Sequence, residues 1–122
     1  MSEIFSSERS FRLWELHVGH SRLLVRSGRN YDDDSENVDL VFDGVVWIQV
    51  PDWLKGLVIR EVSGEVAESV LRNVWFETQH VRVFELASQG RTYFVAASFL
   101  RIETNKRNPT ESVFRNEEIP GP

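Results

Sequence analysis

The stretch Val38–Val50 reads VDLVFDGVVWIQV, two apolar, strand-like runs separated by the dipeptide Asp43-Gly44. Asp-Gly is a favoured two-residue loop of a type I′ hairpin, because both loop residues need positive φ angles, which glycine tolerates freely. The stretch therefore predicts a tight hairpin in which Phe42 faces Val45 across the two strands.

This predicted hairpin would be apolar on both of its faces. Side chains alternate along a strand, which places five apolar residues on one face: Val38, Leu40, Phe42, Val45 and Trp47. The opposite face would carry Asp39, Val41, Val46 and Ile48. Because a water-exposed face would be polar, we expect a central hairpin covered on both sides by other elements or by a partner chain.

The rest of the chain predicts further hairpins and one short helix. Strand-like runs are expected at 11–18, 22–26, 57–62, 81–87 and 91–102. The turn at Gly90 fits either a two-residue loop or a three-residue loop with a bulge, which leaves the register of that hairpin open. The small residues at 96–98 indicate close approach of another element.

The apolar spacing changes at Ser63 from that of a strand to that of a helix. We expect a helix over 64–73, with Ser63 as its N-cap. The competing interpretation is a strand over 73–76, because valine and aromatic residues favour pleated surfaces.

These elements predict one mostly-β domain over 11–102, between a flexible N-terminus at 1–10 and a polar tail at 103–122. Antiparallel hairpins with one short helix are compatible with a two-sheet sandwich and with a small open barrel, of which a cupin-like barrel is one form. Val113-Phe114 is the apolar anchor by which the tail would dock onto the domain.

The composition of the 122-residue chain narrows its function class. Its net charge is −5, which argues against nucleic acid as a partner, since phosphate binding requires a basic patch. The absence of cysteine excludes disulfides, thiolate metal sites and cysteine nucleophiles. With no signal-peptide pattern and no run of about 18 apolar residues, we expect a cytoplasmic protein without membrane association.

The three histidines are the candidate metal ligands: His17, His20 and His80. Glu15 could add a carboxylate to a two-histidine site. The spacing H-x-x-H across a turn matches no strong metal motif, and the cupin pattern of two histidines one residue apart followed by a glutamate is absent. We therefore predict no metal site and no cofactor.

Other motifs for binding or catalysis are weak. DDDSEN, at Asp32–Asn37, resembles the start of a calcium loop, but its sixth position holds Asn37 where glycine is required. An acidic surface loop is the expected structure. There is no G-x-S-x-G elbow and no glycine cluster before a helix. No catalytic residue is identified, and whether the chain is an enzyme stays open.

The four tryptophans are numerous for this length. Trp14 and Trp47 are expected in the core because both lie in apolar runs. Trp53 follows Pro51 in a connector and is expected to be a partly exposed anchor. Three residues of the last hairpin are also expected in the core: Phe84, Val95 and Phe99.

The chain resembles a group of small uncharacterised bacterial proteins in three stretches: WELHVGHSRLLVRS (Trp14–Ser27), VDLVFDGVVWIQVP (Val38–Pro51) and RTYFVAAS (Arg91–Ser98). The resemblance lies in the order of strand, histidine-serine turn, acidic loop and Asp-Gly-like hairpin, and it covers most of Phe11–Ile102. That group has no assigned activity, so the resemblance implies a bacterial source and carries no site residue onto this chain.

Two hypotheses for the function follow. The leading one is a non-enzymatic interaction or assembly module, acting as a homo-oligomer or as the partner of another protein, because the central stretch is apolar on both faces and no catalytic set converges. The alternative is a small-ligand or metal-binding β-barrel, including an enzyme that uses His17, His20 or His80 with an acid.

Overall fold

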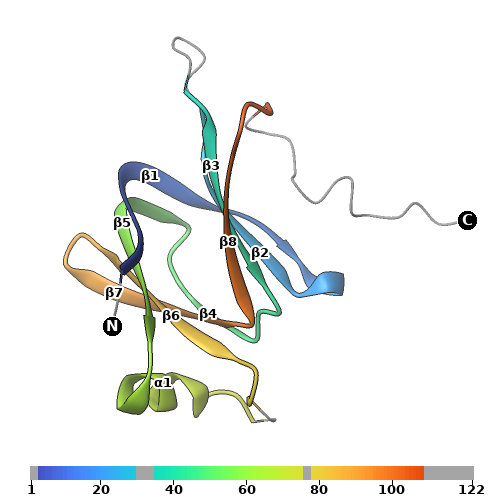
Figure 1. Ribbon diagram of the computed structural model, residues 1–122, viewed down its shortest axis with the longest axis vertical. Coiled ribbons are helices and arrows are strands. Elements are labelled where there is room, and N and C mark those ends of the chain that lie inside the picture. The colour runs from blue at the N-terminus through green and yellow to red at the C-terminus, as the bar shows by residue number, and fades with distance from the viewer. Residues whose placement is uncertain (1–2, 30–34, 76–77, 109–122) are drawn as a thin grey trace, which may run out of the picture.

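The computed structural model describes residues 3–29, 35–75 and 78–108, which form one eight-stranded antiparallel sheet and one short α-helix (Figure 1). The strands are β1 (Glu3–His17), β2 (Arg22–Ser27), β3 (Asn37–Asp43), β4 (Trp47–Gln49), β5 (Trp53–Val62), β6 (Arg82–Ser88), β7 (Arg91–Ala97) and β8 (Phe99–Asn105). The 3-10 turn η1 (Val18–His20) joins β1 to β2, and the helix α1 is Gly64–Leu71. The expected mainly-β antiparallel fold with one short helix is confirmed.

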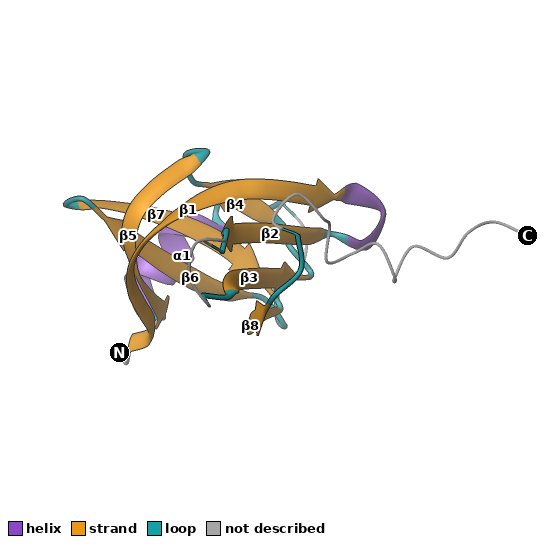
Figure 2. Cartoon of the chain, turned by 90° about the horizontal axis from the view of Figure 1, so that it is seen from above, coloured by secondary structure: helices purple, strands orange, loops and turns teal. Residues whose placement is uncertain are grey.

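The sheet has the strand order β4-β7-β6-β5-β1-β2-β3-β8. Its two edge strands continue interior strands of the same sheet, since β4 follows β3 along the chain and β8 follows β7. β3 pairs with β8, and β4 pairs with β7, so the bent stretches 37–49 and 91–105 run beside each other. The sheet therefore curls around a single interior in the manner of an open barrel (Figure 2).

The hairpin predicted at Asp43-Gly44 is wrong. β3 lies between β2 and β8, whereas β4 lies beside β7, and the described ladders do not pair β3 with β4. Gly44 has a positive φ of 68°, but Asp43 does not share it and remains in β3. A type I′ turn needs positive φ at both positions, so the chain bends here instead of reversing. The stretch passes from one set of partner strands to another.

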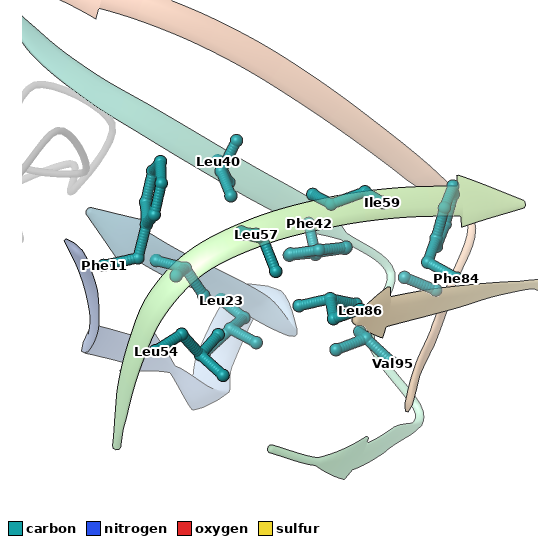
Figure 3. Close-up of a cluster of buried hydrophobic side chains, with 12 residues drawn as sticks. Phe11, Leu23, Leu40, Phe42, Leu54, Leu57, Ile59, Phe84, Leu86 and Val95 are labelled. Carbon is teal, nitrogen blue, oxygen red and sulfur yellow. The ribbon is translucent and has the colours of Figure 1, made fainter. Parts of the chain in front are cut away.

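The main core fills the inside of the curled sheet (Figure 3). Its buried residues come from strands throughout the chain: Phe11, Leu23, Val25, Leu40, Phe42, Leu54, Leu57, Ile59, Phe84, Leu86, Val95 and Ala97. The rings of Phe42 and Phe84 meet edge to face, with centroids 5.7 Å apart. The core positions expected for Phe84 and Val95 are confirmed.

The core position expected for Phe99 is wrong, because its side chain is 59% exposed. Ala97 points into the core and so does Leu100. The break in the strand at Ser98 adds one residue to the alternation, and Phe99 therefore points outward. Trp14, also expected in the core, is exposed at the surface of β1, where the register shifts between Leu13 and Glu15.

A second cluster covers the outer face of the sheet near α1. Val70 of the helix packs with Val62, Val83 and Ala96, and Val46 and Trp47 pack against the same group. The helix begins where it was expected and ends two residues earlier, at Leu71. Ser63 occupies the N-cap position with extended backbone, but within the described chain its side chain makes no capping hydrogen bond.

The remaining strand predictions are mostly confirmed. β1 and β2 form the first hairpin, and β6 and β7 form the last one. Ser88 pairs with Arg91, with positive φ at both Gln89 and Gly90, so that turn is the two-residue form. The N-terminal residues from Glu3 onward belong to β1 and pair with β5.

Trp53 is half-exposed, as expected, but it opens β5 and does not lie in a connector. Much of the expected acidic loop, Asp32–Asp34, and the expected tail anchor Val113-Phe114 lie outside the described residues. None of the described helices has the length and apolar character needed to cross a membrane.

Candidate functional site

The structure separates the three candidate histidines. His17 and His20 lie at the two ends of η1 with their rings stacked, the centroids 4.6 Å apart and the planes 11° from parallel. His80 lies elsewhere, in a cavity lined by Gln79, Arg82 and Phe99 among others. Imidazole lone pairs lie in the ring plane, so two stacked rings direct them along parallel lines and not towards one ion. Among the described residues, no three histidine, aspartate or glutamate side chains are grouped to hold a metal.

The more distinctive site is a slit in the wall of the curled sheet, between β1 and β4. β1 pairs with β5 as far as Arg12, and from Leu13 onward the described strands pair with it only through β2. The Leu13 N–H makes the last link towards β5, donating to the Asp52 carbonyl at 2.8 Å. β4 pairs with β7 along one edge, and no described strand lies along its other edge.

A β-bulge at the start of β4 sets the direction of its backbone groups. Val46 donates its N–H to the Ala96 carbonyl at 2.9 Å, and Trp47 also pairs with Ala96. Two residues opposite one partner form a bulge, and the side chains of both pack on the same outer cluster. Trp47 and, two residues later, Gln49 therefore bond to β7. The residue between them, Ile48, directs its N–H and C=O towards the slit.

The turn between β1 and β2 forms the other wall of the slit. The Val45 N–H donates to the Ser21 carbonyl at 2.9 Å, which holds this turn directly beside the start of β4. Ser21 adopts φ 50°, a left-handed conformation that ends η1 and turns the chain into β2. The slit is therefore bounded by a hydrogen-bonded frame and not by loose loops.

The slit encloses a cavity of about 280 Å³. Its lining is Ser21 and six apolar residues: Leu16, Val18, Val45, Val46, Trp47 and Ile48. Val45 and Ile48 also contact the main core, so the floor of the slit is continuous with the protein interior. The described lining contains no histidine and no acid, and such a surface supports binding and not acid–base or nucleophilic chemistry.

Apolar side chains gather at the mouth of the slit. Leu16 is 48% exposed and Val18 is 78% exposed, and Leu13 and Trp14 of β1 are exposed nearby along the strand. Single exposed apolar residues are common on proteins, but a group of them beside an apolar cavity marks a binding surface. We call Leu16, Val18 and the cavity beneath them the apolar slit.

A buried ion pair supports β1 from the neighbouring strands. The Arg26 Nε lies 2.7 Å from Oδ1 of Asp39, and the two side chains are 1% and 0% exposed. Asn105 donates a further hydrogen bond to Asp39 Oδ2 at 2.8 Å. The Arg26 guanidinium lies 5.8 Å from the ring centroid of Trp14, a cation–π contact that holds this side chain of β1.

The charged network continues beside this pair but offers no reactive group. Asp43 accepts from Arg22 at 2.8 Å and from Arg101 at 2.9 Å, and Arg101 also bonds Glu103 at 2.8 Å. Each of these charges has an opposite charge in contact. We therefore assign the network a structural role in joining β2, β3 and β8.

Sequence reasoning missed both the apolar slit and the buried ion pair. A signal for the ion pair existed, because Arg26 and Asp39 interrupt apolar strands, where charges occur mainly in pairs. The signal for the slit was the apolar character of both faces at 45–48, which was interpreted as one arm of a hairpin. The strand is instead an edge whose open side faces the slit.

Comparison with protein-family models, with curated proteins and with solved structures finds no match to this chain. The resemblance to small bacterial proteins therefore stays a prediction, and the function has to be argued from the geometry.

Proposed function

We propose that the protein is a non-enzymatic protein-interaction module that binds a partner chain through the apolar slit. The observation that carries this proposal is the exposure of Leu16 and Val18 beside an apolar cavity and an open strand edge. Burying such side chains in an interface removes apolar surface from water, which contributes about 25 cal/mol per Å².

The surroundings of the slit favour a protein partner over a small substrate. Protein interfaces are depleted in charge at their centre and enriched in aromatic residues, and the slit combines Trp47 with aliphatic side chains. Its cavity of about 280 Å³ lies just below the range of about 300–1,000 Å³ typical of small-molecule sites. The acidic net charge of −5 argues against nucleic acid.

The test places a photo-crosslinking amino acid at Val18 and, as a matched control, at Val66. Val66 is 42% exposed and lies on α1, away from the lining of the slit. We expect position 18 to cross-link one partner in the native host and position 66 not to do so. The purified partner should then bind wild-type protein at least about tenfold more tightly than the Leu16→Asp variant.

Two results would contradict the proposal. One is equal cross-linking from positions 18 and 66. The other is a strictly monomeric protein by light scattering whose cross-linked partner binds the Leu16→Asp variant as tightly as the wild type.

A further inference from the structure

We infer that the occupant of the apolar slit is an extended segment of another polypeptide, which pairs as an added strand with the open edge of β4. This inference rests on the proposed function and specifies the class of partner. It also assigns a role to backbone atoms, and the proposed function alone does not require one.

The backbone of β4 offers the hydrogen bonds for such a strand. The bulge at Val46 and Trp47 turns these two residues and Gln49 towards β7. The Ile48 N–H and C=O consequently face the slit, and the described residues supply no hydrogen-bond partner for them. Edge strands with exposed backbone groups pair readily with an incoming chain, which gains affinity from main-chain bonds and specificity from alternate side chains.

The lining matches the side chains of an extended segment. Consecutive residues of a strand point to opposite faces, so every second residue of the incoming chain would face the cavity floor formed by Val45 and Ile48. Leu16 and Val18 stand on the opposite wall and would cover those side chains from water. A segment with apolar residues at alternate positions fits this arrangement. The net charge of −5 favours basic residues on its flanks.

A second copy of this chain fits the slit poorly. A two-fold dimer would have to bring two β4 edges together. In each copy the β1–β2 turn lies directly beside the start of β4, held by the bond between Val45 and Ser21. The two turns would meet before the edges could pair. A single extended chain needs only the spacing of about 4.8 Å between neighbouring strands, and it can enter the slit end-on.

The experiment uses the full-length protein to select from random displayed peptides of about ten residues, roughly the length of a long strand. We expect enriched peptides to carry apolar residues at alternate positions. In the unbound protein the Ile48 amide should exchange with solvent faster than the amides of Trp47 and Gln49. Binding of a selected peptide should slow exchange at Ile48 by at least about tenfold.

A backbone-modified peptide separates strand pairing from apolar contact alone. The selected peptide is prepared with N-methyl groups at every second residue, in both phases, so that its side chains stay the same and one phase removes the N–H groups that face β4. We expect at least one phase to lose about tenfold or more in affinity. The protein remains wild type, so no variant has to fold.

The outcomes assign the result clearly. Failure to enrich alternating peptides, or equal binding of both N-methylated phases, overturns strand addition. If the parent peptide is also weakened by Leu16→Asp, the proposed function stands while this inference fails. A concentration-dependent dimer that protects the Ile48 amide would make a second copy the occupant, and would overturn the inference as well.

Discussion

Gly44 and Ser98 are in contact where both bent strand stretches change partner. A β-carbon built on Gly44 would lie 2.5 Å from Oγ and 2.9 Å from Cβ of Ser98, and the Ser98 N–H donates to the Asp43 carbonyl at 2.9 Å. This contact joins the β3–β4 bend to the β7–β8 bend. It therefore holds the curl of the sheet and, with it, the position of β4 beside the slit.

Gly44→Ala should destabilise the fold strongly. The added methyl group needs positive φ, which costs about 1–2 kcal/mol, and it also collides with Ser98, which adds about 1–3 kcal/mol of overpacking. We expect a total loss of about 2–5 kcal/mol in the free energy of unfolding, measured by urea denaturation followed by circular dichroism.

Gly90→Ala is the matched control for this effect. Gly90 also has positive φ, 75°, but a β-carbon added to it would meet no other atom within 4 Å among the described residues. Its loss should stay near the conformational term of about 1–2 kcal/mol. Equal losses for the two variants would show that the contact with Ser98 does not support the bend.

Removing one member of the Arg26–Asp39 pair should be costly. Asp39→Ala leaves the buried Arg26 guanidinium without its carboxylate, and breaking a buried pair from one side costs about 3–5 kcal/mol. The double variant Arg26→Met/Asp39→Leu should recover most of this loss, because apolar residues of similar volume replace both charges. Urea denaturation of the single and double variants measures the coupling.

An exposed pair provides the comparison. Arg82 and Glu61 are 3.9 Å apart, and both side chains are about half-exposed. Glu61→Gln should change the free energy of unfolding by less than about 1 kcal/mol. If Asp39→Ala has as small an effect as Glu61→Gln, the buried pair does not support β2 and β3 in the way argued above.

The exposed residues of the apolar slit should contribute little to stability. Val18→Ala is expected to change the free energy of unfolding by about 0.5 kcal/mol or less, because the side chain is mostly in water already. Leu86→Ala, in the main core, should cost about 2–5 kcal/mol. Thermal or urea unfolding of the two variants checks this difference, and a large loss for Val18→Ala would show that its role is packing and not binding.

Zinc should not stabilise the protein through its paired histidines. Ligands bound only to the folded state raise the melting temperature, and the stacked rings of His17 and His20 do not converge on one ion. The melting temperature with added zinc should shift equally in the wild type and in the His17→Ala/His20→Ala variant. A zinc-dependent rise confined to the wild type would restore a metal-binding function.

Local pattern in the sequence was sufficient for most individual elements. The change of spacing at Ser63 predicted α1, the alternation around Phe84 and Val95 predicted two core residues, and the small residues at 96–98 predicted the close approach that Gly44 makes to Ser98. These properties depend on neighbours along the chain, and alternation or helical spacing records them directly.

The tertiary structure decided which strands pair and where the site lies. Asp43-Gly44 is compatible with both a reversal and a bend, and the choice depends on β2, β7 and β8, which lie far away in the sequence. One inserted residue at Ser98 was enough to turn Phe99 outward, because side-chain faces follow alternation only within an unbroken strand. The apolar slit exists because β1 and β4 each lack a neighbour on one edge, a property of the assembled sheet that no single segment carries.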